Sequence, residues 1–229
     1  MQQKIWQLEA LSVRRISVSE MQNNVYLLTS RSSGSQVLID AADDLPAIVE
    51  LIGSGQHDVA AGVRPELLAV ITTHSHWDHV RALAPLVDAQ WTGATERVGA
   101  REIATLAGRL DALAIEVPTS TPLDHGDHPE FGDFSLEVIH LRGHTPGSIA
   151  LLYRSPLGAA HLFTGDSLFP GGVGNTQQDA ARFQQLFTDV KERIFAVLPD
   201  DTIVHPGHGE ETTLGAERPR LPEWQARGW

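Results

Sequence analysis

The sequence contains no cysteine among its 229 residues. Disulfide bonds, thiolate nucleophiles and cysteine-ligated zinc are therefore excluded. Basic residues are also few: the chain has 17 lysines and arginines and 29 aspartates and glutamates, so its formal net charge is −12. Since the affinity of proteins for nucleic acids depends on neutralising phosphates, we expect no nucleic-acid partner.

Long apolar segments are missing as well. No run approaches the ~18 consecutive apolar residues of a membrane-spanning helix, and residues 1–15 lack the apolar stretch of a signal peptide. We therefore expect a cytoplasmic protein with no membrane partner. The length of the chain and the lack of a recognisable linker predict one domain over residues 1–229, and no pattern fixes an oligomeric state.

Apolar residues follow two patterns that mix along the chain. Short runs bounded by turn residues predict strands at residues 25–28, 37–39, 67–71, 134–141, 149–153, 161–164 and 202–204. Helical spacing predicts helices that begin near Asp44, Asp78, Thr95 and Thr176, the third with Ile103, Leu106 and Leu110 on one face and the fourth reaching Leu198. This mixture predicts sheets that are covered by helices.

The densest group of chemically active residues reads T-H-S-H-W-D-H at positions 73–79, directly after a predicted strand. Residues two apart in an extended segment point to the same side, so His74 and His76 can bind one metal ion. Asp78 and His79, which turn into the next predicted helix, can face a second ion. The spacing therefore predicts part of a metal site.

Further candidate ligands follow other predicted strands. His144, Asp166 and His208 each come after an apolar run and lie among glycines and prolines. Such loops allow close approach of the backbone and fixed turns. Imidazole nitrogen and carboxylate oxygen suit zinc, and also iron or manganese. The sequence thus predicts a metal site assembled from several loops.

In this order, the motifs resemble those of the metallo-β-lactamase-fold hydrolase superfamily, and the resemblance extends from Asn24 to His208. It implies an α+β fold of the αββα type, in which two mixed β-sheets pack face to face with helices on the outer faces. It also implies two divalent metal ions, zinc or alternatively iron or manganese. The implied ligands are His74, His76 and His144 for one ion, Asp78, His79 and His208 for the other, and Asp166 as a bridge between both.

Within this superfamily, a bridging carboxylate at Asp166 disfavours the β-lactamase branches. Residues 143–148 (GHTPGS) and 164–169 (TGDSLF) are similar to those of glyoxalase II-type thioester hydrolases. The resemblance implies a small-molecule thioester, an S-acyl thiol, as the substrate. The carrier thiol stays open, because residues 172–175 read GVGN where glyoxalase II carries Gly-Cys-Gly-Arg, and because the segment after His208 is short.

The implied mechanism uses a metal-bridging hydroxide. Two metal ions can share a water and lower its pKa towards ~7, so that hydroxide attacks the acyl carbon. Asp78 is the expected catalytic residue, which orients the hydroxide or accepts its proton. The alternatives are a lactonase or phosphodiesterase of the same superfamily and a mononuclear iron persulfide dioxygenase. A ribonuclease is disfavoured by the acidic charge, and a binding module by the presence of every ligand.

Several residues beside these motifs receive other interpretations. We expect Asp40 to contact a ligating histidine, as metal sites often require. His125 and His128 flank a predicted turn and are expected in solvent, whereas His205 is expected to pack near the site. Trp77 is predicted to pack under the start of a helix, or alternatively to form a wall of the substrate site.

Overall fold

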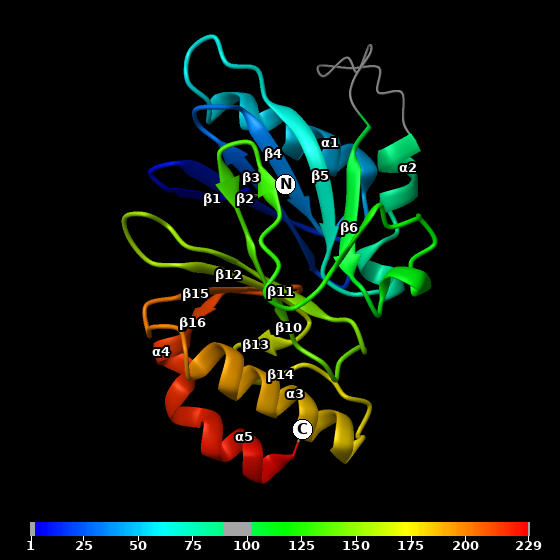
Figure 1. Ribbon diagram of the computed structural model, residues 1–229, viewed down its shortest axis with the longest axis vertical. Coiled ribbons are helices and arrows are strands. Elements are labelled where there is room, and N and C mark those ends of the chain that lie inside the picture. The colour runs from blue at the N-terminus through cyan, green and yellow to red at the C-terminus, as the bar shows by residue number, and fades with distance from the viewer. Residues whose placement is uncertain (1–2, 89–101, 229) are drawn as a thin grey trace.

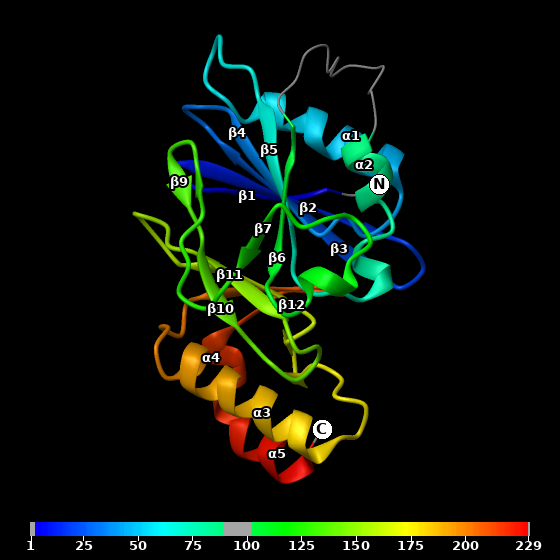
Figure 2. The same ribbon diagram turned by 45° about the vertical axis from the view of Figure 1, so that its right-hand side comes forward.

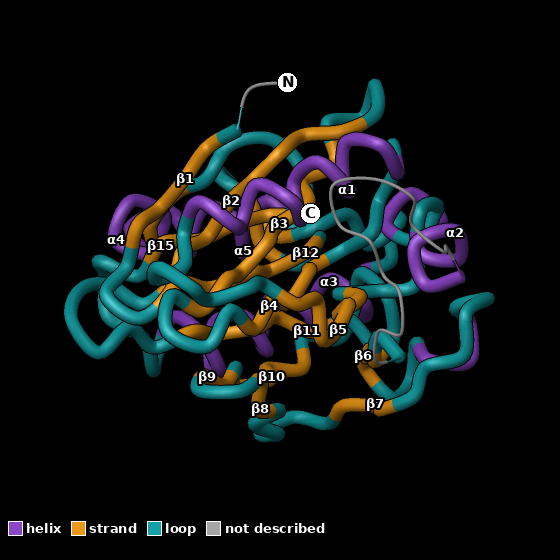
Figure 3. The backbone as a smooth tube through the Cα atoms, turned by 90° about the horizontal axis from the view of Figure 1, so that it is seen from above, coloured by secondary structure: helices purple, strands orange, loops and turns teal. Residues whose placement is uncertain are grey.

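Two β-sheets pack face to face in the computed structural model, and helices cover the outer face of each sheet (Figures 1 and 2). The structure describes residues 3–88 and 102–228. The view from above in Figure 3 shows β7 as the outer strand beside β6, in agreement with the strand order. This four-layer arrangement confirms the αββα architecture expected from the sequence.

The first sheet has seven strands in sequential order. Its first four strands pair antiparallel, and its last four pair parallel. The strands are β1 (Lys4–Gln7), β2 (Leu11–Val18), β3 (Asn23–Ser30), β4 (Ser35–Ile39), β5 (Glu66–Thr72), β6 (Ala104–Gly108) and β7 (Thr121–Leu123). The strands predicted at residues 25–28 and 37–39 are therefore confirmed as parts of β3 and β4, which pair antiparallel.

The second sheet has five strands in the order β10-β11-β12-β15-β16, and β12 and β15 are its parallel pair. Its strands are β10 (Glu137–His140), β11 (Ile149–Tyr153), β12 (His161–Gly165), β15 (Ile203–Pro206) and β16 (Thr212–Thr213). Two small hairpins accompany it, β8 (Glu130–Phe131) with β9 (Phe134–Ser135), and β13 (Leu168–Phe169) with β14 (Gly172–Val173).

The helices lie on the two outer faces. They are α1 (Leu45–Ser54) and α2 (Leu83–Asp88) on the first sheet, and α3 (Ala180–Val190), α4 (Leu214–Glu217) and α5 (Leu221–Arg227) on the second. Short helical turns complete the set: η1 (Gly55–His57), η2 (Trp77–His79), η3 (Ala112–Ala114), η5 (Arg218–Arg220) and the π-helical η4 (Lys191–Phe195). Within residues 3–88 and 102–228, no helix has the length and apolar character that crossing a bilayer requires.

The main core lies between the sheets, and β3 explains how the sequence forms it. Successive residues of a strand point to opposite faces. Tyr26 and Leu28 therefore pack between the sheets, whereas Val25 and Leu27 pack under α1 and α2. Because both faces of β3 are covered, its apolar run is continuous rather than alternating.

Strand direction brings several loops to one edge of the sandwich. β10 and β12 are both antiparallel to β11, and β15 is parallel to β12, so β10, β12 and β15 end at the same edge. The end of β5 reaches this edge too, because the backbone N–H of Ile149 donates to the carbonyl of Thr73 at 2.9 Å. The loops after these four strands carry the candidate ligands.

Three predicted helices differ from the structure. The helix expected from Thr95 falls partly outside the described residues, and its part with Ile103, Leu106 and Leu110 is wrong: residues 104–108 form β6, and Leu110 is exposed. A short, mostly apolar run fits a buried strand as well as a helix, and pairing with β5 decides for the strand.

The helix expected near Asp78 begins later, because residues 77–79 form only the turn η2 and α2 starts at Leu83. The last predicted helix likewise starts at Ala180 rather than at Thr176. Its N-terminus is set by Asp179, whose carboxylate accepts hydrogen bonds from the backbone N–H groups of Ala181 and Arg182.

Candidate metal centre

The loop that follows β5 takes a compact path into the turn η2. Its first residue is tied to the end of β4, because the carboxylate of Asp40 accepts hydrogen bonds from the backbone N–H and the hydroxyl of Thr73, both at 2.8 Å. The backbone N–H of His79 then donates to the carbonyl of His76 at 3.0 Å. This path leaves the side chains of His74 and His79 buried at the edge of the sandwich.

His74, His76 and His144 form the first group of converging side chains. The ring centre of His74 lies 4.8 Å from that of His76 and 4.8 Å from that of His144, and the last two lie 4.5 Å apart. One ring nitrogen from each histidine lies within 4.8 Å of the others. Since His144 comes from the loop after β10, this group joins the two sheets.

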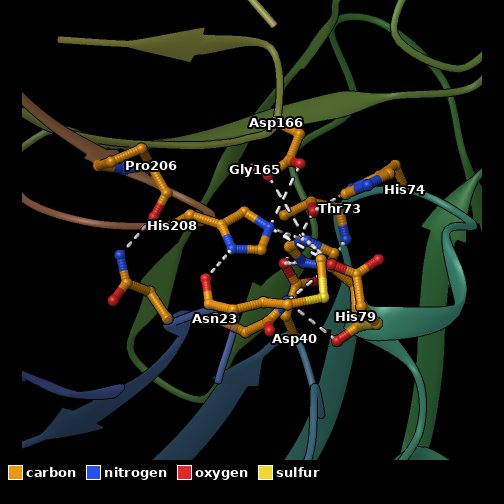
Figure 4. A network of polar contacts seen from close by, with 12 residues as sticks. Asn23, Asp40, Thr73, His74, His79, Gly165, Asp166, Pro206 and His208 are labelled. Atoms are coloured by element: carbon orange, nitrogen blue, oxygen red, sulfur yellow. Dashed lines mark hydrogen bonds and ion pairs between the residues drawn. The ribbon is translucent and has the colours of Figure 1, made fainter. Parts of the chain in front are cut away.

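Asp78, His79 and His208 form the second group. Nε2 of His79 lies 3.2 Å from Nε2 of His208, and Figure 4 shows the two rings side by side. Oδ2 of Asp78 lies 3.4 Å from Nε2 of His208 and 3.6 Å from Nε2 of His79. These atoms also approach within 4.8 Å of one another, so the group could hold a metal ion.

Asp166 lies between the two groups. Its Oδ2 is 3.6 Å from Nε2 of His144 and 3.4 Å from Nε2 of His208, and its Oδ1 is 3.5 Å from Nε2 of His79. The carboxylate thus lies beside members of both groups, and Figure 4 shows it with His208 and His79 of the second group. The structure therefore brings together every residue that the sequence named as a candidate ligand.

The donor atoms of this centre fit metal ions. In the described part of the chain, Nε2 of His74, Nε2 of His144 and Oδ1 of Asp166 are buried without a hydrogen-bond partner. Buried polar atoms are normally satisfied, so three unsatisfied lone pairs at one place require an explanation. Imidazole nitrogens and a carboxylate oxygen are suitable donors for zinc, iron or manganese, and a bound cation would satisfy them.

The outer ring nitrogens of three histidines are held by the protein. Nδ1 of His79 lies 2.9 Å from Oδ2 of Asp40, Nδ1 of His144 lies 2.8 Å from the carbonyl oxygen of Asn175, and Nδ1 of His208 lies 2.9 Å from the carbonyl oxygen of Met21. A ring that donates through Nδ1 keeps the lone pair of Nε2 for the centre. The prediction that Asp40 contacts one of these histidines is confirmed.

Burial and charge set the protonation of the centre. Burial and the neighbouring His79 move the pKa of His74 well below its usual 6.5. Burial also disfavours the charged form of His79, but the charge of Asp40 and its hydrogen bond outweigh burial and raise the pKa of His79 to about 9. Burial alone would raise the pKa of Asp166, yet the hydrogen bond from His208 and the charge of His79 hold it below its usual range. His74 is therefore a neutral imidazole and Asp166 an ionised carboxylate, which are the forms that bind cations, whereas His79 must release a proton when a cation binds.

Two polar residues at the centre carry no signal in the sequence. Nδ2 of Asn23 donates to Oδ2 of Asp78 at 2.9 Å and to its carbonyl at 3.1 Å. Oδ2 of Asp111 accepts a hydrogen bond from the backbone N–H of Ser75 at 2.8 Å. These contacts span 55 and 36 positions of the chain, so only the fold brings the partners together.

The remaining sequence interpretations have mixed outcomes. His125 and His128 are exposed as expected, and His205 packs against Phe163 with ring centres 4.8 Å apart. The prediction that Trp77 packs beneath a helix is wrong. Its side chain is 60% exposed, and the guanidinium of Arg81 lies 5.2 Å from its ring centre. A role for Trp77 as a wall of the substrate site stays a prediction.

Known proteins are similar to this chain over most of its length. "Probable metallo-hydrolase YqgX" of Bacillus subtilis is 32% identical, over 91% of this chain and 95% of its own length. "Hydroxyacylglutathione hydrolase GloC" of Haemophilus influenzae is 26% identical, over 93% of this chain and 97% of its own length. The crystal structure of TTHA1623 in a di-iron-bound form has 32% identity and a TM-score of 0.65, over 89% of this chain and 96% of that one.

The family comparison agrees with the fold and with the centre. Residues 18–208 match the family model of the Metallo-beta-lactamase superfamily, a range that begins in β2 and includes every member of both side-chain groups. The match therefore covers β3 to β15 and the edge where the two sheets meet, whereas β1, most of β2 and β16 lie outside it. The chain belongs to the metallo-β-lactamase superfamily of metallo-hydrolases.

Proposed function

We propose that this protein is a dinuclear metal-dependent thioesterase that hydrolyses a small S-acyl thiol. The observation that carries the proposal is the position of the Asp166 carboxylate, within 3.6 Å of His144 on one side and 3.4 Å of His208 on the other. A carboxylate with both oxygens available between two donor groups suits a shared ligand of two cations. A site for a single cation would need only one of the two donor groups.

The ligand assignment follows from the two groups. We assign His74, His76 and His144 to one ion, Asp78, His79 and His208 to the other, and Asp166 to both. Zinc is the proposed resident metal, because it suits nitrogen-rich sites in hydrolases. The di-iron-bound structure of TTHA1623 supports a pair of ions and keeps iron as the alternative.

The chemistry divides between the ions and the chain. A pair of bound divalent cations lowers the pKa of water and polarises an acyl carbonyl oxygen. Asp78 is the proposed catalytic residue, which orients the attacking water or accepts its proton. Asn23 supports this role, because its two hydrogen bonds to Asp78 fix both the backbone and the carboxylate of that residue.

A thioester suits this site better than an oxygen ester or an amide. Thiolate is a good leaving group and needs little help from a general acid. GloC of Haemophilus influenzae, named as a hydroxyacylglutathione hydrolase, supports the same substrate class. We also propose a cytoplasmic location, where small thiols are kept reduced, and no nucleic-acid or membrane partner.

The test combines metal analysis with a panel of substrates. Protein loaded with zinc, iron or manganese is assayed on S-acyl thiols with different carriers, a lactone, a phosphodiester, and a persulfide with oxygen uptake. We expect about two ions per chain, and thioester hydrolysis that stops on chelation and returns on reloading. Phosphodiester or lactone turnover far above thioester turnover would overturn the assignment. A single iron per chain with oxygen uptake would overturn it in favour of persulfide oxidation.

A further inference from the structure

Asp111 lies between the two loops that carry the first histidine group. It follows β6 and is almost fully buried, with 1% of its surface exposed. Its Oδ2 accepts hydrogen bonds from the backbone N–H of Ser75 at 2.8 Å and from the hydroxyl of Thr145 at 2.6 Å. Its Oδ1 accepts one from the backbone N–H of Gly147 at 2.7 Å. A single carboxylate thus accepts hydrogen bonds from the loop of Ser75 and from the loop of Thr145 and holds both in place.

The positions of these donors connect Asp111 to the ligands. Ser75 stands between His74 and His76, and Thr145 directly follows His144. The loop of Ser75 leaves the first sheet and the loop of Thr145 leaves the second, so the carboxylate joins ligands that come from different sheets. Asp111 therefore controls the distance between them through the backbone.

The backbone around Asp111 and the loop of Thr145 are in close contact. A Cβ atom on Gly108 would overlap the carbonyl oxygen of Gly147, and a Cβ atom on Gly147 would overlap the backbone nitrogen of Asp111. Neither glycine has a positive φ, so close approach rather than backbone conformation explains the residue type at both positions. At this contact, no residue larger than glycine fits at position 108 or position 147.

The buried charge of Asp111 also favours a cation at the neighbouring histidine group. The three donors that it accepts from are two backbone N–H groups and a hydroxyl, all uncharged. A carboxylate buried among neutral donors is costly, and a cation nearby reduces that cost. The first histidine group is the place beside it where a cation could bind.

We propose that Asp111 is a positioning residue that sets the geometry and the affinity of the metal position formed by His74, His76 and His144. The proposal rests on metal binding in the proposed function but not on the thioester substrate. Removing such a supporting partner of a metal site typically weakens metal affinity about 10- to 100-fold. A merely structural carboxylate would leave the affinity of the folded protein unchanged.

The test compares Asp111→Asn with Asp58→Asn. Asp58 is also buried, accepts hydrogen bonds from Arg14, Ser12 and Gln7, and belongs to neither ligand group. Both variants are titrated with Zn²⁺ against a competing chelator, and both are loaded with Co²⁺ for visible absorption spectra. Urea unfolding of the metal-free proteins measures their stability separately.

We expect Asp111→Asn to weaken one of the two positions about 10- to 100-fold and to change the Co²⁺ spectrum. Asp58→Asn should lower the free energy of unfolding and leave both metal readouts as in the wild type. If Asp111→Asn does not fold, Thr145→Val removes one of the three hydrogen bonds and keeps the charge, and it should change the same position to a smaller extent.

Three results would overturn the proposal. The first is a folded Asp111→Asn variant, or Thr145→Val if Asp111→Asn does not fold, that has the Zn²⁺ affinity and the Co²⁺ spectrum of the wild type. The second is a loss of Zn²⁺ affinity in Asp58→Asn as large as that in Asp111→Asn. The third is a wild-type protein that binds no cation, which would overturn the proposed function as well. A wild-type protein that binds cations without hydrolysing thioesters would contradict only the proposed function, because the titration and the spectrum do not depend on the substrate.

Discussion

The carboxylate of Asp40 accepts a hydrogen bond from Nδ1 of His79 at 2.9 Å, and this contact orients the imidazole in the metal centre (Figure 4). The same carboxylate accepts two hydrogen bonds from Thr73, which begins the ligand-bearing loop. Asp40 therefore fixes the ring of one ligand and the backbone next to another. Its own backbone has a left-handed φ of 59°.

Replacement of Asp40 by asparagine should weaken the metal position that contains His79. Asparagine tolerates the left-handed φ, so the backbone is kept while the charge and one acceptor are lost. We expect affinity at that position to fall about 10- to 100-fold in chelator competition. Asp43→Asn is the matched control, because Asp43 is partly exposed and pairs with Arg81. Equal affinities in the two variants would contradict the role of Asp40.

Replacement of His76 by alanine should remove a ligand of the first group. The loss leaves two histidines where three converge, so we expect about one bound ion per chain instead of about two. Hydrolysis should fall at least about 100-fold, measured as kcat/KM with saturating zinc. His128→Ala is the control, since His128 is exposed and outside both groups. Full activity in His76→Ala would show that the ligand assignment is wrong.

The candidate ligands could be predicted from the sequence because four of them are neighbours in the chain. His74, His76, Asp78 and His79 lie within six positions, and the rest follow apolar strands at glycine-containing turns. Parallel strand directions then bring those turns to one edge. Spacing and strand ends thus contain most of the information about the centre.

Asp40 could be expected from its place at a strand end, but the supporting residues Asn23 and Asp111 could not be predicted, because their partners are distant in the chain. Asp111 fastens loops from two sheets, and Asn23 reaches Asp78 across 55 positions. The same limit applies to residues 104–108, which form β6 because they pair with β5. Local pattern specifies neither a pairing partner nor a hydrogen bond across the fold.

Replacement of Arg14 by alanine should destabilise the protein without affecting the metals. Arg14 contacts Asp58 through two nitrogens at 2.5 and 2.8 Å, and both side chains are buried. Without the guanidinium, a buried carboxylate loses its counter-charge, which costs about 3–5 kcal/mol in the free energy of unfolding. Urea unfolding of the metal-free protein measures this change.

The control for Arg14→Ala is Arg154→Ala, which breaks an exposed pair with Glu137. Exposed pairs contribute about 0–1 kcal/mol, so the two variants should differ clearly. Metal content should stay as in the wild type in both. A destabilisation by Arg14→Ala no larger than that of the control would mean that Asp58 is solvated once Arg14 is removed.

A pair of buried histidines predicts how stability depends on pH. Nδ1 of His161 lies 2.8 Å from Nε2 of His205, and both side chains are buried. Burial lowers the pKa of His161 to about 4, against about 6.5 in an unfolded chain. Between these values the unfolded state binds a proton that the folded state does not. This contribution is therefore fully present above pH 6.5 and is lost as the pH falls through 4.

Replacement of His161 by glutamine should flatten this dependence. Glutamine can still hydrogen-bond to His205 but does not titrate, so the slope of unfolding free energy against pH should fall by about 1.4 kcal/mol per pH unit in this window. The measurement uses metal-free protein in chelator, because protonation of ligand histidines would otherwise release metal and add its own pH dependence. The ligand histidines are the same in both proteins, so the difference between the two curves isolates His161. Parallel curves would mean that His161 is protonated equally in the folded and unfolded states, which its burial against His205 argues against.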